Sequence, residues 1–153
     1  MPFESTLFQL AQSFLWPVTL LVLAVFAYAV MSLGAFAVEW LRRRRQPGAV
    51  LVLAAAGPAS PEALELRVLK ELEGVRLCSR VAPMLGLVAT MIPMGPALVA
   101  VASGQSQGVA QSLAPAFAAV IVSLVAASIS FVIYSVRRRW LLAELVSLVE
   151  QDA

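Results

Sequence analysis

Two long stretches of the chain carry no charged residue. None of the nine acidic and eleven basic residues lies between Glu4 and Glu39, and none lies between Arg80 and Arg137. A helix needs about 20 apolar residues to cross a bilayer, so each stretch is long enough to span. Charged residues make up 13% of the chain, against roughly 25% in a soluble domain. The sequence therefore predicts an all-α, polytopic membrane protein.

The second uncharged stretch, residues 81–136, is too long for one helix. It is interrupted at 103–108, where two glycines and four polar residues favour a tight turn. The pattern predicts a helical hairpin with spans at 81–102 and 109–136. With a first span at 14–41, the chain is expected to have three transmembrane helices.

Two arginine runs set the expected orientation, because basic residues after an apolar segment hold that helix end at the cytoplasmic face. The predicted topology anchors are Arg42, Arg43, Arg44 and Arg45, followed by Arg137, Arg138 and Arg139. The C-terminal helix 137–153 is then cytoplasmic and segment 1–13 is periplasmic or interfacial, in a bacterial or archaeal inner membrane. Segment 1–13 has no basic residue, so it is not expected to be a cleaved signal peptide.

Residues 42–80 are predicted to form a cytoplasmic loop and helix. Ser60 followed by Pro61 is typical of a helix start. The apolar face of the helix is expected to carry Leu64, Val68, Leu72 and Val75. The ion pairs expected along the chain are Glu39 with Arg43, Arg67 with Glu71 and Glu73 with Arg76.

The composition excludes several kinds of site. The chain has no histidine and one cysteine, so it offers no imidazole metal site and no internal disulfide. No nucleophile–base pair, phosphate loop or carboxylate dyad is visible, so we expect no enzyme activity, no metal and no cofactor. The confined basic runs indicate topology, with membrane lipid as a secondary partner, and not nucleic acid. Cys78 is expected to be a packing residue, with a reactive thiol as the alternative.

Small and weakly polar residues recur on one side of each hairpin helix. In the second span they recur every four residues, and in the third span the serine side chains point within about 20° of one another around the helix axis. One hypothesis is close helix packing, since small residues let backbones approach. The other is a pore lining in an oligomer. The packing candidates are Ala82, Gly86, Ala116 and Ala119, and the pore-lining candidates are Thr90, Ser112, Ser123 and Ser130.

Pro93 and Pro96 stand near the outer end of the second span. Proline inside a helix kinks it or leaves a carbonyl without its donor. We expect a neighbouring helix or water to satisfy those carbonyls.

Residues 80–90, RVAPMLGLVAT, resemble the APLLGLLGTV signature of the MotA/TolQ/ExbB proton-channel family. Residues 116–124, then 131–134 and the second arginine run, are similar to that family's third span. The resemblance covers about residues 72–140. It implies a ring of three-helix subunits, typically a pentamer, around a dimer of a single-span partner of the ExbD/TolR/MotB type. In that family the partner's membrane aspartate carries the proton, and the resemblance implies the same arrangement here.

By position, Thr90 matches the family's pore threonine, and Ser123 stands where the third span usually has glycine. This chain departs from the family at Ala119 and Val120, where a threonine is common. The short cytoplasmic segment favours the ExbB/TolQ-like branch over the flagellar stators.

The resemblance implies a subunit of a channel or motor driven by proton motive force, with sodium less favoured. Such a subunit energises a periplasmic or outer-membrane process such as transport. The alternative is a non-conducting membrane scaffold that assembles through its small-residue faces. A substrate transporter is disfavoured, because the sequence shows no inverted repeat.

Overall fold

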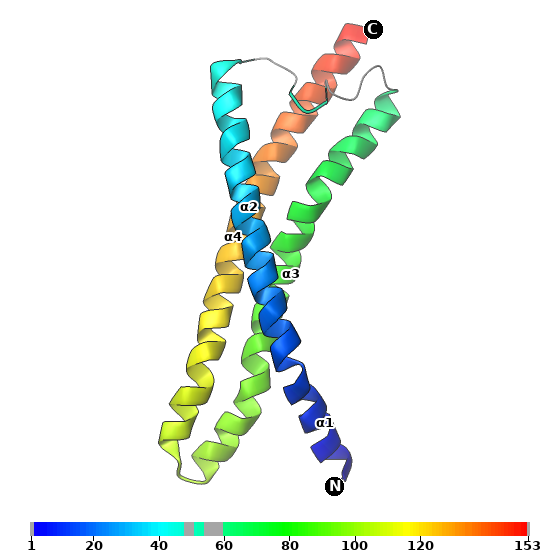
Figure 1. The fold of residues 1–153 in the computed structure, drawn as a ribbon. Helices are drawn as coiled ribbons and strands as arrows, with labels where there is room; N and C mark the ends of the chain where they lie inside the picture. The colour runs from blue at the N-terminus through cyan, green and yellow to red at the C-terminus, as the bar shows by residue number, and fades with distance from the viewer. Residues whose placement is uncertain (1, 48–50, 54–59, 153) are drawn as a thin grey trace.

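The computed structural model describes residues 2–47, 51–53 and 60–152. Four helices account for most of them: α1 (Pro2–Ser13), α2 (Leu15–Arg45), α3 (Pro61–Ala102) and α4 (Ser106–Asp152) (Figure 1). Three segments are long and apolar enough to cross a membrane: Phe3–Arg45, Pro61–Ala102 and Gln107–Gln151. The predictions of an all-α fold and of three such helices are confirmed.

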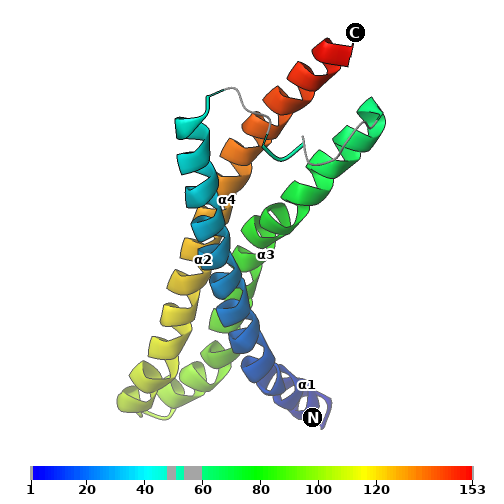
Figure 2. The same ribbon diagram turned by 45° about the horizontal axis from the view of Figure 1, so that its top comes forward.

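Helices α3 and α4 form the predicted antiparallel hairpin. Helix α3 ends at Ala102, and Gly104 adopts a φ of +74°, a left-handed conformation that costs glycine little. Helix α4 begins at Ser106, inside the segment expected to be turn. The turn and α1 lie at one end of the bundle and the C-terminus at the other (Figure 1, Figure 2).

Helix α2 crosses the hairpin near its middle (Figure 2). The side chains at the crossing are small and buried, with Val25, Phe26 and Ile129 packed around them. Small residues allow three helix backbones to approach closely, which is how helices associate where lipid removes the hydrophobic driving force. The buried residues at the crossing are Ala29, Cys78, Ala82, Ala126 and Ala127.

A second buried cluster lies where α3 begins. The Ser60 hydroxyl accepts from the backbone N–H of Ala63 at 3.4 Å, so the predicted helix start is confirmed. The expected apolar face of α3 is buried, and Leu53 from the α2–α3 connection packs against it with Leu141.

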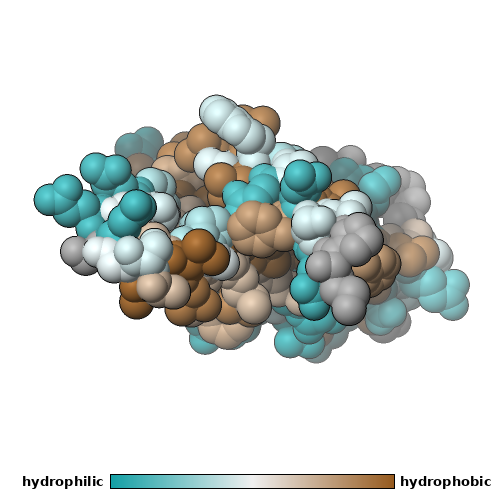
Figure 3. Space-filling view, turned by 90° about the horizontal axis from the view of Figure 1, so that it is seen from below, coloured by the Kyte–Doolittle hydropathy of each residue, from teal (hydrophilic) through white to brown (hydrophobic). Residues whose placement is uncertain are grey.

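Large apolar side chains cover the outside of the bundle. Trp16 is 78% exposed, and Ile121 is 63% exposed. Seen from the end that carries α1 and the α3–α4 turn, hydrophilic and hydrophobic residues lie side by side (Figure 3). These apolar surfaces suit lipid or a neighbouring chain as their surroundings.

Candidate functional site

The four pore-lining candidates do not share one environment. Ser123 and Ser130 on α4 are 1% and 0% exposed, between α4 and α3. Thr90 on α3 and Ser112 on α4 are only partly buried. Ser123 and Ser130 therefore take part in the packing of α4 against α3.

The hydroxyl of Thr90 is held by its own helix. It donates to the Leu87 carbonyl at 2.7 Å and lies 3.4 Å from the Gly86 carbonyl. The proton of the hydroxyl is thereby engaged, while the oxygen keeps acceptor capacity. The Thr90 oxygen can therefore accept a further hydrogen bond.

Ser123 and Gly86 lie in close contact between α4 and α3. A Cβ built at Gly86 would overlap the Ser123 hydroxyl and would lie 3.1 Å from Ser123 Cβ. The Ser123 hydroxyl donates to the Val120 carbonyl of its own helix at 2.8 Å. Ala82 and Ala116 are buried in the same interface, and Ala119 is partly buried. The packing candidates thus lie between the helices.

Cys78 joins the three long helices at their crossing. The Ser130 hydroxyl on α4 donates to the Cys78 sulfur at 3.0 Å, and the thiol lies 3.8 Å from the Val25 carbonyl on α2. Cys78 is 6% exposed. This burial favours the packing role over a reactive thiol, which needs access to reagents.

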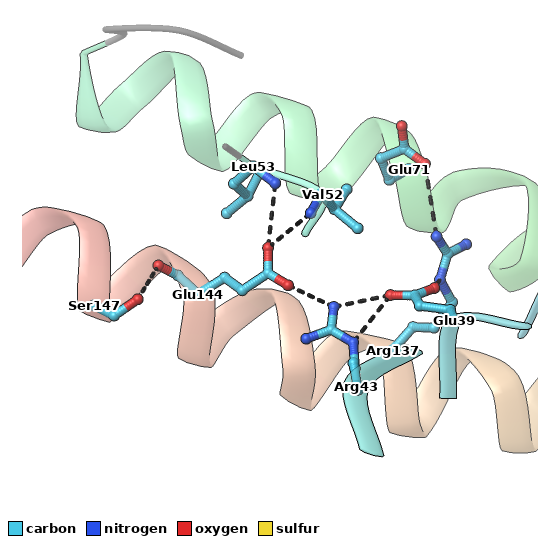
Figure 4. A network of polar contacts seen from close by, with 8 residues as sticks. All are labelled: Glu39, Arg43, Val52, Leu53, Glu71, Arg137, Glu144 and Ser147. Carbon is cyan, nitrogen blue, oxygen red and sulfur yellow. Dashed lines mark hydrogen bonds and ion pairs between the residues drawn. The ribbon is translucent and has the colours of Figure 1, made fainter. Parts of the chain in front are cut away.

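An ion network ties the helices together at the end that carries the arginine runs (Figure 4). The predicted pair of Glu39 and Arg43 is confirmed, with 2.8 Å between Oε1 and a guanidinium nitrogen. Arg137 Nε lies 2.9 Å from the other oxygen of Glu39, and a further nitrogen of Arg137 lies 3.9 Å from Glu71. Glu71 was expected to pair with Arg67, and the structure places it beside Arg137.

Glu144 on α4 completes this network and was missed by the sequence analysis. It is 5% exposed, and its Oε1 lies 2.5 Å from Arg43. Its Oε2 accepts from the backbone N–H groups of Val52 and Leu53, both at 3.2 Å. The signal was its position between Leu141 and Leu145, on the buried face of α4.

The side chains of Arg43 and Arg137 are only 17% and 20% exposed. Arg43 also lies 4.8 Å from the Trp140 ring, which stacks on Phe36 with 5.3 Å between centroids. These two arginines therefore hold α2 against α4.

The amide of Gln12 on α1 satisfies a carbonyl that proline leaves without a donor. Pro96 has no N–H, so the Ile92 carbonyl four residues earlier lacks its helical partner. Gln12 Nε2 lies 3.3 Å from that oxygen. The expectation that a neighbouring helix satisfies a freed carbonyl is confirmed at this position.

Replacing Gln12 by leucine should lower stability by about 1 kcal/mol, because the Ile92 carbonyl would lose its donor in an apolar setting. Thermal unfolding of the purified chain in detergent measures this loss. Gln9→Leu is the matched control, since Gln9 is exposed on the same helix. Equal Tm values for the two variants would show that the Gln12 contact does not stabilise the fold.

The comparison with known proteins agrees with this architecture. The model of the MotA/TolQ/ExbB proton channel family matches residues 59–150, which include all of α3 and nearly all of α4. No curated protein and no solved structure gives a significant match. Because the family match covers more than half of a chain with three helices able to span a bilayer, this multi-pass membrane protein belongs to the MotA/TolQ/ExbB proton channel family.

Proposed function

We propose that the chain is the ring-forming subunit of an ion-driven motor in the inner membrane, working with a single-span, aspartate-bearing partner. Family membership over residues 59–150 is the observation that carries this proposal. The ring, a pentamer by resemblance, turns proton passage into work on a periplasmic or outer-membrane process such as transport. The chain has no catalytic activity of its own in this proposal.

The need for a partner follows from the uncharged hairpin. Residues 81–136 contain no acidic or basic residue. A membrane charge costs from about 2.5 to more than 10 kcal/mol, so a proton carrier must be a group that can be neutralised there. A carboxylate on a partner helix supplies that group, and the partly buried Thr90 oxygen is available to hydrogen-bond its protonated form.

The surfaces of the hairpin support assembly. On α3, Met84, Leu87 and Met91 are all more than 60% exposed, and on α4 Phe117 and Ile121 are equally exposed. Neighbouring copies and lipid together would cover such a surface.

The position of the arginine runs supports a common cytoplasmic end. The contacts of Arg43 with Glu144 and of Arg137 with Glu39 bring the two runs together at one end of the bundle. By the positive-inside rule, that end faces the cytoplasm and α1 lies outside. The connection between α2 and α3, residues 46–60, is short, which favours the ExbB/TolQ-like branch.

Thr90→Val tests the ion pathway, because valine keeps the shape of threonine and removes its hydroxyl. We expect ion flux to fall about tenfold, equivalent to 1.4 kcal/mol in the barrier. The complex purified from its host membranes is reconstituted in liposomes, and proton uptake is followed with a pH-sensitive dye. Thr90→Ser should restore flux, since it returns the hydroxyl.

Ring size by native mass spectrometry and Tm should be the same in all three proteins. Loss of assembly in Thr90→Val would instead support the packing role. A ring that lacks both a partner and ion flux would support the alternative of a non-conducting scaffold.

A further inference from the structure

A half-open groove of about 860 Å³ lies between α3 and α4 at the end of the bundle that carries the arginine runs. Five leucines form much of its apolar wall. Its basic residues are Lys70, Arg76, Arg80 and Arg138, and its acidic residue is Glu73. The lining therefore combines an apolar wall with a net formal charge of +3, which suits an anionic amphiphile.

The basic side chains of the groove have no ion-pair partner in the described part of the chain. The sequence predicted a pair of Glu73 with Arg76, and this prediction is wrong, because the structure does not bring the two side chains within ion-pair distance. The Tyr134 hydroxyl also lines the groove, and no described residue accepts its proton. The groove thus offers cationic and hydroxyl donors for which the described fold supplies no acceptor.

Arg76 and Arg80 stand where α3 enters the membrane. Arg80 is the last charged residue before the uncharged stretch 81–136. Cα–Cβ bonds lean toward the N-terminus of a helix, which for α3 is the end of the bundle that carries the arginine runs. The two guanidinium groups therefore reach back toward the membrane surface, in a groove that they share with Tyr134 and Arg138 of α4. Lipid phosphates lie at this boundary between the apolar span and the charged end.

The acidic residues at this end of the bundle lie away from Arg80. On α3 the nearest is Glu73, seven residues earlier and about 10 Å away along the helix. Glu39 and Glu144 are already engaged in the ion network (Figure 4). Copies related by an axis along the membrane normal keep each residue at one depth. A neighbouring copy in a ring therefore cannot place its own acidic residues beside Arg80, whereas a lipid can place its phosphate there.

We propose that this groove binds an anionic phospholipid of the leaflet at the arginine end. The lipid phosphate is held between the α3 arginines and Arg138, and it accepts a hydrogen bond from the Tyr134 hydroxyl. An acyl chain packs on the leucines of the wall, of which Leu77 is 54% exposed. The net positive charge favours a lipid with a net negative charge over a zwitterionic lipid. The site needs only the α3–α4 hairpin, so it goes beyond the proposed function and does not depend on ion flux.

Lipid binding to the purified full chain tests the site. The chain is delipidated in a nonionic detergent and titrated with phosphatidylglycerol or with phosphatidylcholine of the same acyl chains, and native mass spectrometry gives the dissociation constant of each adduct. Phosphatidylglycerol should bind about tenfold more tightly than phosphatidylcholine. Equal affinities would overturn the proposal. Soluble glycerol phosphate should not displace the bound lipid, and displacement would show that the groove recognises a free phosphate ester instead.

Two double variants with the same change of charge locate the site. Arg80→Gln with Arg138→Gln removes one groove arginine from each helix, and it should weaken phosphatidylglycerol binding at least about tenfold and abolish the preference over phosphatidylcholine. Arg67→Gln with Arg139→Gln is the matched control, because both arginines are exposed on the same two helices and neither lines the groove. Its affinity should change less than about twofold. Similar losses in the two double variants would reduce the effect to overall charge and would overturn the site.

Tyr134→Phe tests the hydrogen bond to the phosphate. The variant keeps the ring that packs on the buried cluster around Leu53 and removes a hydroxyl that no described residue binds. Its Tm without lipid should equal that of the native chain, so it tests the site whether or not the glutamine variants fold. Both lipids should bind several-fold more weakly, because both carry a phosphate. Unchanged affinity for both lipids would overturn the placement of the phosphate in the groove.

These results are separable from the proposed function. Loss of ring assembly in the groove double variant, with lipid binding unchanged, would show that a second copy covers the groove and would overturn the lipid site. Lipid binding does not require ion flux, so its failure would leave the proposed motor standing. Failure of the flux assay on the Thr90 variants would in turn leave the lipid site standing.

Discussion

Replacing Glu144 by leucine should destabilise the chain by about 3 kcal/mol, at the lower end of the range for breaking a buried ion pair. Glu144 is 5% exposed and binds Arg43 together with the N–H groups of Val52 and Leu53. Leucine would remove the acceptor that Arg43 and the two backbone N–H groups share. The loss is limited because Glu39 still lies 2.8 Å from Arg43.

Thermal unfolding in detergent should record this loss as a fall in Tm of about 6 to 12 °C. Glu150→Leu is the matched control, since Glu150 is exposed on the same helix. The Tm of Glu144→Gln should lie between the Tm values of these two variants, because the glutamine amide oxygen can still accept hydrogen bonds from the backbone. If Glu144→Leu and Glu150→Leu unfolded at the same temperature, the network would not stabilise the fold.

Adding one methyl group at Gly86 should also have a large effect. Gly86→Ala places a Cβ against the Ser123 hydroxyl, and overpacking of this kind costs about 1 to 3 kcal/mol. Ser123→Ala removes the hydroxyl and should restore most of the loss in the double variant. The remaining distance of 3.1 Å to Ser123 Cβ requires only a small shift.

A double-mutant cycle on the free energy of unfolding measures this coupling. Gly34→Ala serves as control, because nothing lies within 4 Å of a Cβ there, and it should be neutral or slightly stabilising. Additive effects of Gly86→Ala and Ser123→Ala would contradict a direct contact between the two side chains.

Much of the fold could be predicted from local patterns. Charge-free stretches predicted the three long helices, and the glycines and polar residues at 103–108 predicted the hairpin turn. Ser60 with Pro61 predicted the start of α3. Each of these signals lies within a few residues of the feature it determines. Local sequence is therefore sufficient to predict features that depend on interactions between neighbouring residues.

The network and the site depend on distant partners. Glu144 and Arg43 are 101 residues apart in the sequence. Burying a carboxylate is unfavourable unless it is paired, so the sequence around Glu144 alone could not predict its burial. Helical periodicity placed Ser123 and Ser130 on one side of α4, but it could not tell whether that side faces α3 or a pore. The prolines indicated that carbonyls would need donors, and only the structure identified Gln12.

The register of the hairpin also affects the surrounding bilayer. Cys78 lies against Ser130, so Arg80 stands about level with Ser128, whereas the first basic residue after the α4 span is Arg137. The helical rise from Ser128 to Arg137 puts about 14 Å between the two charged ends. Phe131 and Val132 fall within that step, and both are more than half exposed. A leaflet of uniform thickness cannot match both helices, so at this end the bilayer thins beside α3 or the Arg80 side chain extends toward the headgroups. Lipid chain length should therefore affect the stability of the hairpin in the membrane.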